Sequence, residues 1–239
     1  MADRRAFSPT ELAQLARCEQ QLLFDRARGA KRSAAWRQRS SEGQREHERL
    51  HRRVTGQRPD DGLQGIYRML IYVLAAIGAA LFLFIILGQK TESSHDALLP
   101  SELQGAQLAL SEKTLVRKKP VHVRGRPDEV WLKNGRRVIV ETKTRSGRVF
   151  EGDRMQLAAY AYLLRGDGGP PLAPYGFIRF TGEGISFAKV KLRDDDAVID
   201  AHRRLQKLTK GREEPRFASS AALCKGCGHR DLCPADRAA

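Results

Sequence analysis

The sequence predicts an α/β domain in which a small mixed sheet is flanked by helices. Apolar residues recur at helical spacing near the amino terminus, whereas the alternation typical of strands begins near Leu110. Two uncommon features accompany this pattern: the uncharged run from Met69 to Leu87, and three cysteines near the carboxyl terminus. We therefore expect an N-terminal helical region, an inserted apolar helix, a sheet core and a C-terminal cysteine clasp.

Composition narrows the classes of protein. A chain of 239 residues suits one domain with an insertion. The excess of 43 Lys and Arg over 28 Asp and Glu predicts a polyanionic partner, either nucleic acid or an anionic membrane surface. No signal peptide is expected, and four cysteines without an export signal favour metal or cluster ligation over disulfides.

The N-terminal part is expected to be helical. Ser8 and Glu11 form a capping-box pattern ahead of leucines at roughly helical spacing, and a basic, mostly helical segment follows from Arg26 to Arg53. We assign residues 1–58 to the helical part of the domain. Residues 59–105 are expected to form an insertion that carries the apolar helix 66–88.

The rest of the chain alternates strands with two helices. Expected strands cover 114–118, 121–132 and 136–144, and a Lys133-Asn134-Gly135 turn joins the last two. A helix at 153–165, a hairpin from 175–181 and 185–192, and an amphipathic helix at 194–211 complete the core at 106–215. The tail, 216–239, is too short to pack alone, so its cysteines must tie it down.

Two carboxylates and a lysine fall at the ends of adjacent predicted strands. Glu141 and Lys143 share one strand face, and a hairpin pairing would bring Asp128 alongside them. This arrangement is costly unless a cation binds there, and hard oxygen ligands suit Mg²⁺ or Mn²⁺. Such an ion would polarise a phosphate and lower the pKa of a bound water, which Lys143 could orient. The alternative is an exposed aspartate and a Glu–Lys pair on a sheet edge.

Further motifs are ordinary when each is taken alone. His47 lies four residues after Gly43 on an expected helix, where it could be a nitrogen ligand or a simple surface or core histidine. Gln156 and Tyr160 share one helix face, as in any amphipathic helix.

Together these motifs resemble the iron–sulfur-bearing branch of the RecB-like PD-(D/E)XK nucleases. The closest likeness is to the CRISPR-associated exonucleases that trim DNA during spacer acquisition. The resemblance covers residues 8–58 and about 105–234, and the apolar insertion departs from the family pattern. The motifs occur in the family's order: Cys18, Gly43-x3-His47, Asp128, Glu141-x-Lys143, Gln156-x3-Tyr160, and Cys224, Cys227 and Cys233.

The resemblance implies a restriction-endonuclease-like core and a role for each motif. Asp128, Glu141 and Lys143 would be catalytic, and Gln156 and Tyr160 would line the side of the site that faces DNA. The implied ligands of Mg²⁺ or Mn²⁺ are His47, Asp128, Glu141 and the Thr142 carbonyl.

The four cysteines are expected to bind one structural centre. Cys224, Cys227 and Cys233 could reach it together, and Cys18 is the remaining fourth ligand. Their spacing fits Zn²⁺ as well as a 4Fe–4S cluster, and the resemblance favours the cluster. Either centre would clasp the C-terminal tail to the first helix. His229 could substitute for one ligand, but it is expected on the surface of the loop.

Arginines crowd the region around His47. Arg45, Arg49 and their neighbours predict a phosphate-binding surface, although a solvated charge-rich helix pair would look the same. Trp36, among these charges, could stack on a base of single-stranded DNA or anchor a core.

The expected function is a metal-dependent DNA nuclease, an exonuclease acting on single strands in DNA processing, repair or CRISPR spacer acquisition. CRISPR adaptation proteins are then candidate partners in antiviral defence. The alternative is a non-catalytic, membrane-held nucleic-acid-binding adaptor that retains the nuclease fold.

The apolar run predicts contact with membrane lipid through residues 66–88, although a buried core helix is the alternative. Nineteen residues nearly cover a hydrocarbon core of ~30 Å at ~1.5 Å per residue. A complete span would separate Cys18 and His47 from Asp128 and Glu141. We therefore expect a re-entrant or interfacial helix and a membrane-associated protein with its nuclease domain in the cytoplasm.

Overall fold

The computed structural model describes residues 6–29, 34–55, 98–218, 220–225 and 227–234. The chain divides into two compact units, residues 1–51 with 105–239, and residues 52–104. In the second unit, the described residues include the end of helix α3 and a short 3-10 helix, η2 (Ser101–Leu103), in which the Leu103 N–H donates to the Pro100 carbonyl at 2.8 Å. The predicted apolar helix 66–88 lies outside the described residues.

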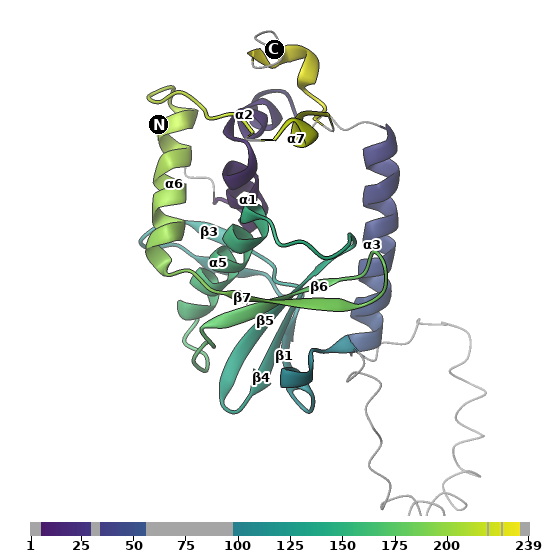
Figure 1. Ribbon diagram of the computed structural model, residues 1–239. Coiled ribbons are helices and arrows are strands. Elements are labelled where there is room, and N and C mark those ends of the chain that lie inside the picture. Colours follow the sequence, from purple (N-terminus) through teal and green to yellow (C-terminus); the bar gives the residue numbers. More distant parts are fainter. Residues whose placement is uncertain (1–5, 30–33, 56–97, 219, 226, 235–239) are drawn as a thin grey trace, which may run out of the picture. The chain divides into compact units, whose positions relative to one another are not determined.

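The first unit contains the predicted mixed sheet, in the order β1-β4-β5-β6-β7 (Figure 1). Every neighbouring pair is antiparallel except β5 and β6, which run parallel. A parallel pair needs a crossover, and helix α5 (Glu151–Arg165) supplies it. The strands are β1 (Gln107–Ser111), β4 (Glu129–Lys133), β5 (Arg136–Lys143), β6 (Tyr175–Phe180) and β7 (Ser186–Lys191).

The β4–β5 hairpin turns at the predicted place, although Lys133 belongs to β4 and the turn itself has two residues. Asn134 and Gly135 both have positive φ angles, 50° and 73°, which a type I′ hairpin turn requires. The resulting register pairs Lys133 with Arg136 and Glu129 with Val140. Asp128, directly before β4, therefore lies beside the carboxyl end of β5.

The predicted strand 121–132 is in fact two separate strands. Its first part is β3 (Val123–Gly125), which pairs with β2 (Leu115–Arg117) in a two-stranded sheet. Its second part is β4 in the main sheet. Pro127 lies between them and has no N–H to donate to a ladder, so the strand breaks there and leaves Asp128 at the start of β4.

The expected first helix is also divided, at Cys18. Cys18 has extended backbone angles and separates α1 (Pro9–Arg17) from α2 (Glu19–Arg28). The capping box at Ser8 is confirmed, since the Glu11 N–H donates to Ser8 Oγ at 3.1 Å and the Ser8 N–H donates to Glu11 Oε2 at 2.9 Å. The break exposes the first N–H groups of α2, and the Arg216 carbonyl accepts from two of them.

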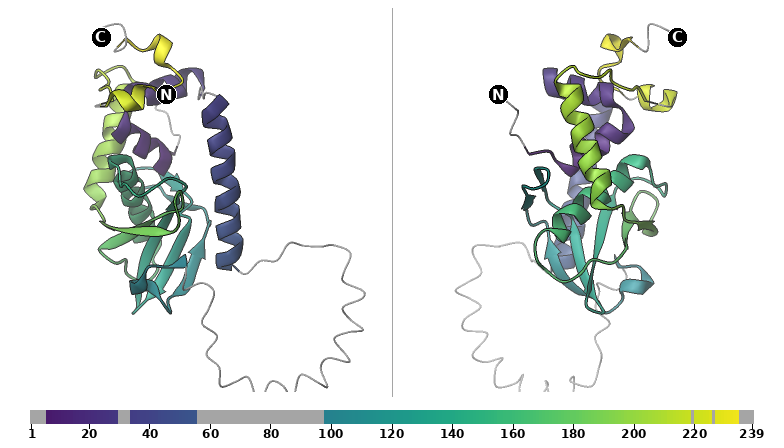
Figure 2. Two further views of the ribbon diagram at one scale, coloured as in Figure 1. Left: turned by 45° about the vertical axis from the view of Figure 1, so that its right-hand side comes forward. Right: turned by 90° about the vertical axis from the view of Figure 1, so that its left-hand side faces the viewer.

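Helices α1 and α5 pack together over one face of the sheet (Figures 1 and 2). Their contact buries Leu12 and Leu157 against sheet residues such as Ile139 and Ile178. Helix α6 (Asp195–Thr209) packs against α1 and α5, and Asp194 caps it by accepting the Ala197 N–H. The remaining elements are α3 (Ala34–Thr55), α7 (Ala221–Lys225) and the 3-10 helix η3 (Arg230–Leu232).

The prediction of a membrane-associated protein is contradicted. Within the part of the chain that the structure describes, no helix is both long enough and apolar enough to cross a membrane. Helix α3 has 22 residues, but exposed arginines run along it. Helices α5 and α6 have 15 residues each, and at ~1.5 Å per residue they fall short of a ~30 Å hydrocarbon core.

Candidate active site

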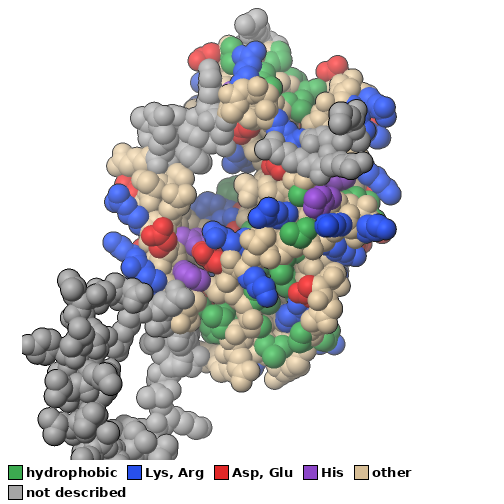
Figure 3. All heavy atoms as spheres, turned by 180° about the vertical axis from the view of Figure 1, so that it is seen from behind, with side chains coloured by type: hydrophobic (Ala, Val, Ile, Leu, Met, Phe, Trp, Pro, Cys, Tyr) green, Lys and Arg blue, Asp and Glu red, His purple; other side chains and the backbone are tan. Residues whose placement is uncertain are grey.

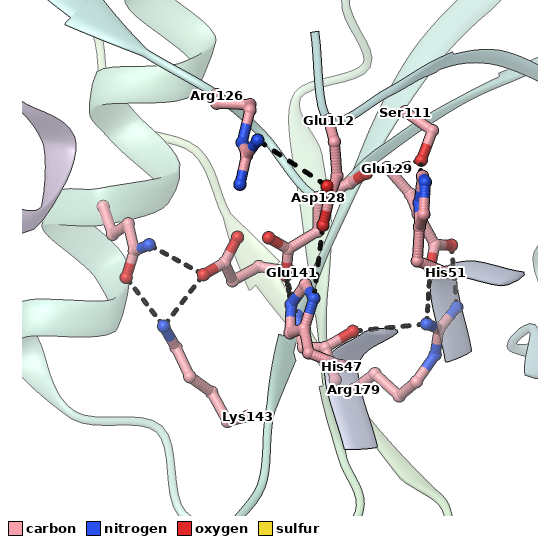
Figure 4. Close-up of polar contacts among 12 residues, drawn as sticks. His47, His51, Ser111, Glu112, Arg126, Asp128, Glu129, Glu141, Lys143 and Arg179 are labelled. Atoms are coloured by element: carbon pink, nitrogen blue, oxygen red, sulfur yellow. Dashed lines mark hydrogen bonds and ion pairs between the residues drawn. The ribbon is translucent and has the colours of Figure 1, made fainter. Parts of the chain in front are cut away.

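Side chains from β5 and α5 converge at the carboxyl end of β5. Glu141 Oε1 accepts hydrogen bonds from Lys143 Nζ at 2.9 Å and from Gln156 Nε2 at 2.7 Å. Lys143 Nζ also donates to Gln156 Oε1 at 2.7 Å, and Gln156 Nε2 lies 3.1 Å from Tyr160 Oη. The structure thus joins the predicted Glu-x-Lys and Gln-x3-Tyr motifs in one network, and Figure 4 shows Glu141 and Lys143 facing each other.

The second oxygen of Glu141 has no partner. Glu141 is 4% exposed, and its Oε2 is buried without a hydrogen bond. Burial, reinforced by the negative charge of Asp128, raises the pKa of Glu141 to about 8. Because buried polar atoms are almost always paired, this oxygen marks a place where a positively charged ligand would be stabilised.

Asp128 is held by a helix and by a strand. Its Oδ2 is 2.8 Å from His47 Nε2 on α3 and accepts the Thr142 backbone N–H at 2.7 Å. Burial opposes ionisation of Asp128, but the hydrogen bond and charge of His47 lower its pKa overall. The same hydrogen bond raises the pKa of His47 to about 9, so the two form an ion pair at neutral pH.

Gly43 explains how α3 comes close enough for His47 to reach this site. A Cβ atom at position 43 would lie 2.8 Å from Thr144 Oγ1, just beyond the end of β5. Any larger residue would require the helix or Thr144 to shift. The predicted Gly-x3-His motif therefore combines a close approach with a side chain one turn later.

Two site residues were missed by the sequence analysis, Ser111 and Glu112 at the end of β1. Glu112 Oε1 lies 3.5 Å from His47 Nδ1, and Ser111 Oγ lies 2.9 Å from His51 Nδ1 (Figure 4). Glu112 has a φ of 46°, a left-handed conformation that costs a non-glycine residue roughly 1–2 kcal/mol. No motif surrounds these residues, so only the fold shows their proximity.

A second missed cluster lies on the opposite face of β5. Arg179 is fully buried and donates to both oxygens of Glu129, at 2.6 and 2.8 Å. It also donates to Thr142 Oγ1 at 3.2 Å, while Trp131 Nε1 donates to Glu129 Oε2 at 2.8 Å. Glu129 follows Asp128 in the chain, and Thr142 follows Glu141. These contacts therefore hold the backbone next to both members of the acidic pair, Asp128 and Glu141.

The donor set fits a divalent cation, although the side chains are paired with each other. In the described ranges, no group of three or more His, Cys, Asp or Glu side chains is arranged to hold a metal ion. His47 bonds to Asp128, and Glu141 bonds to Lys143. The unpartnered Glu141 Oε2 nevertheless offers a hard oxygen beside a second carboxylate, which is the chemistry that Mg²⁺ and Mn²⁺ prefer.

The structure does not show the predicted cysteine clasp. All four cysteines are partly exposed and outside disulfides, and the described residues contain no metal-binding group that includes them. Cys18 lies at the junction of α1 and α2. The others follow one another near the carboxyl terminus: Cys224, Cys227 and Cys233.

Polar contacts tie the tail to α2. The Glu19 carboxylate accepts from Arg204 at 2.7 Å and from Arg216 at 2.8 Å. Although burial opposes ionisation of Glu19, these arginines lower its pKa to about 2. His229, expected on a loop surface, is 1% exposed, and its Nε2 lies 2.7 Å from Asp25 Oδ1.

The predicted basic residues of α3 face solvent. Arg45 and Arg49 are exposed, and Arg49 makes a long contact of 3.5 Å with Glu46. Figure 3 shows Lys and Arg side chains on either side of a recess in which histidine and acidic side chains are visible. The side chain of Trp36 lies outside the described residues.

Comparison with solved structures finds remote likenesses. One is the crystal structure of SSO0001, with 18% identity and a TM-score of 0.47 over 99% of this chain and 89% of that chain. Another is named "Putative exonuclease" and comes from Eubacterium rectale, with 12% identity and a TM-score of 0.48 over the same shares. Both TM-scores are below 0.5. No curated protein matches the chain.

A family model gives the decisive match. The model of the PD-(D/E)XK nuclease superfamily matches residues 6–234, which include every residue of the site described above. The sheet order and the grouping of Asp128, Glu141 and Lys143 agree with that match. The chain belongs to the PD-(D/E)XK nuclease superfamily.

Proposed function

We propose that this protein is a metal-dependent deoxyribonuclease that acts on single-stranded DNA as an exonuclease. Nucleases of the superfamily are phosphodiester hydrolases that typically use Mg²⁺ or Mn²⁺. The observation that carries the proposal is the buried, unpartnered Glu141 Oε2 beside Asp128 and Lys143. DNA repair or CRISPR spacer acquisition would use such an activity, as the motif resemblance suggests.

Four groups would hold the cation: Glu141, Asp128, His47 and the Thr142 carbonyl. When bound, the metal would polarise the scissile phosphate and lower the pKa of an attacking water. Asp128 is oriented for this by the Thr142 N–H, and His47 by its contact with Asp128.

Lys143 serves as a cation in this proposal. Burial lowers the pKa of Lys143, but the neighbouring carboxylates, above all Glu141, outweigh that effect. The net shift of the pKa is upward, and the ammonium stays charged. Its charge would stabilise negative charge that develops on the phosphate in the transition state. Gln156 bonds to both Lys143 and Glu141 and keeps them in register.

The preference for single strands rests on the loop between Lys143 and α5. Phe150 is 49% exposed, and the guanidinium groups of Arg145 and Arg148 lie 4.5 and 5.7 Å from its ring centroid. An exposed ring flanked by arginines is suited to stack an unpaired base while the charges bind phosphates. Arg45 and Arg49 on α3 would supply further phosphate contacts.

The activity is tested with end-labelled single strands, duplexes and RNA in Mg²⁺, Mn²⁺ or EDTA. We expect metal-dependent loss of single-stranded DNA from its ends, abolished by Asp128→Ala and by Glu141→Ala. Asp200→Ala, which removes an exposed carboxylate from α6, is the matched control. Undiminished cleavage by Glu141→Ala would refute the assignment, and DNA binding without any cleavage by the wild type would favour the adaptor function.

The single-strand preference is tested by oligonucleotide binding in EDTA, measured by fluorescence anisotropy. Phe150→Ala should weaken binding by roughly 5- to 150-fold, because stacking contributes about 1–3 kcal/mol per base. Phe150→Trp should retain affinity. Phe217→Ala is the control, since Phe217 is 45% exposed and follows the Arg216 contact with α2. Equal losses from both alanine variants would contradict stacking at Phe150.

For the cysteines we propose a 4Fe–4S cluster held by Cys18, Cys224, Cys227 and Cys233, with structural Zn²⁺ as the alternative. Four partly exposed cysteines outside disulfides support this, as does the contact between α2 and the Arg216 segment, which leads toward Cys224. Anaerobically purified protein should be brown and contain iron, and Cys227→Ser should lose both properties. One zinc and no iron would select the alternative.

A further inference from the structure

We infer that Glu112 is a positioning residue for His47, and that its carboxylate fixes the imidazole with Nε2 directed into the site. The inference rests on the proposed function, because it concerns how the same site binds its cation. It assigns a role to a residue that belongs to none of the recognised motifs.

The two ring nitrogens of His47 face two different carboxylates. Nε2 lies 2.8 Å from Asp128 Oδ2, and Nδ1 lies 3.5 Å from Glu112 Oε1, at ion-pair rather than hydrogen-bond distance. Histidines that bind metals almost always direct their other N–H at a carboxylate, carbonyl or water, which sets the tautomer and the ring orientation. Glu112 occupies that place for His47.

The backbone holds Glu112 in this place. Its φ of 46° lies in the left-handed region, which residues with long side chains rarely adopt. In this conformation the Glu112 N–H donates to the Asp128 carbonyl at 3.1 Å. The two carboxylates that face His47 are therefore linked through one short backbone contact.

The preceding residue secures the same helix. Ser111 Oγ donates to the Asp128 carbonyl at 3.1 Å and lies 2.9 Å from His51 Nδ1, one turn after His47. A hydroxyl has one proton, so His51 Nδ1 is the donor to Ser111 Oγ. Helix α3 thus meets two consecutive residues at the end of β1, and the register of His47 against Glu112 is fixed.

Arg126 is a further charged group near Glu112. Its Nη1 lies 3.8 Å from Glu112 Oε2, and its side chain is 60% exposed. Because this contact uses the other carboxylate oxygen, Oε1 remains directed at His47. An exposed arginine at this distance is a weak competitor.

The test measures Mn²⁺ binding to the full chain by calorimetry. Glu112→Ala should weaken binding by about 10- to 100-fold, as loss of such orienting contacts does elsewhere. Glu112→Gln keeps an acceptor oxygen and should recover most of that loss. Glu, Ala and Gln all carry a Cβ atom, so the positive φ at position 112 strains the backbone to a comparable degree in each protein. Thermal melting checks that each variant folds. Asp200→Ala removes one negative charge without touching His47 and serves as the control.

A second measurement reports on the Nδ1 proton of His47. A cation bound at Nε2 leaves the proton of His47 on Nδ1, and in ¹H–¹⁵N spectra of the Mg²⁺-saturated protein this proton should exchange slowly with water in the wild type and in Glu112→Gln. In Glu112→Ala it should exchange faster. A His47→Asn variant assigns the signal.

Each failure has a distinct meaning. Wild-type Mn²⁺ affinity and unchanged exchange of the Nδ1 proton in Glu112→Ala would overturn the positioning role and leave the nuclease proposal intact. Glu112→Gln as weak as Glu112→Ala would also overturn it, because the carboxylate would then act through its charge or contact the metal itself. A wild-type protein that neither binds Mn²⁺ nor cleaves DNA would overturn the nuclease proposal and this inference with it.

Discussion

Glu129 and Glu141 are equally buried carboxylates on neighbouring strands, yet their surroundings are opposite. Both oxygens of Glu129 accept from Arg179, and one also accepts from Trp131. Glu141 has one oxygen bonded to Lys143 and Gln156 and another with no partner. The two side chains lie on opposite faces of the sheet, because Arg179 bonds Thr142, the neighbour of Glu141. Glu129, with both oxygens hydrogen-bonded, serves the fold, and Glu141, with one oxygen unpartnered, is available for chemistry.

The largest expected effect on stability comes from removing Arg179, the arginine that bonds Glu129. Arg179→Met leaves the Glu129 carboxylate buried without its cation and should lower the free energy of unfolding by about 3–5 kcal/mol. Urea unfolding measures this. Adding Glu129→Leu in the same chain should restore much of the loss. Arg193→Met, which breaks an exposed pair with Glu151, should cost less than ~1 kcal/mol. Equal losses from Arg179→Met and Arg193→Met would remove the structural role given to Glu129.

Substitution of Glu141 should affect activity rather than stability. Glu141→Gln removes the charge that would hold the cation, so cleavage of single-stranded DNA should fall at least about a hundredfold. In EDTA, the same variant should unfold at a urea concentration no lower than the wild type near pH 8, because it no longer buries a carboxylate. A variant that loses stability while it retains cleavage would reverse the comparison.

The pH dependence of stability should sharpen the contrast. The pKa of Glu141 rises from 4.5 to about 8 on folding, so the folded state retains a proton that the unfolded state releases. The metal-free free energy of unfolding should therefore fall as the pH rises from 4.5 to about 8. His47, raised from 6.5 to about 9, contributes stability below pH 6.5 that is lost as the pH rises through 9.

Urea unfolding in EDTA at several pH values measures this dependence. Glu141→Gln should show a shallower decline than the wild type between pH 5 and pH 8. Added Mg²⁺ should restore the most stability at the alkaline end, where the carboxylate is ionised. Parallel curves for both proteins would mean that Glu141 does not titrate in this range.

The smallest effect is expected at Thr142, whose side chain bonds Arg179 on one face of the sheet while its backbone N–H bonds Asp128. Thr142→Val removes the bond from Arg179 to Thr142 Oγ1 and should cost about 1 kcal/mol, because Arg179 keeps both bonds to Glu129. Cleavage should stay within a few fold of the wild type, since the Thr142 backbone N–H still donates to Asp128. A large loss of activity would show that the two faces are coupled through this side chain.

Local chemistry made much of the fold predictable. The Asn134-Gly135 turn, the capping box at Ser8 and the position of the β4–β5 hairpin each depend on neighbours in the chain, and each is confirmed. The hairpin then brought Asp128 beside Glu141 as expected. The strand break at Pro127 was not predicted, although a proline, which has no N–H for a strand ladder, indicates such a break.

Contacts between distant residues were not predictable in the same way. Arg179 lies fifty positions after Glu129, and nothing beside it in the sequence shows that an arginine within an apolar strand will be buried and paired. Glu112 meets His47 only because α3 packs against the end of β1. His229 was expected on the surface, but burial against Asp25 depends on where the tail returns.

The two-residue turn at Asn134 and Gly135 also bears on the order of events during folding. A hairpin closed by so short a loop forms in roughly 1–10 μs, well before contacts that require long loops to close. Asp128 and Glu141 are thus brought together early, whereas His47 is 81 positions from Asp128 and arrives late. The growing chain must tolerate two adjacent like charges in the interval, with Lys143 on the same strand as the nearest cation. The acidic pair is therefore an obstacle during folding before it becomes an asset in the finished protein.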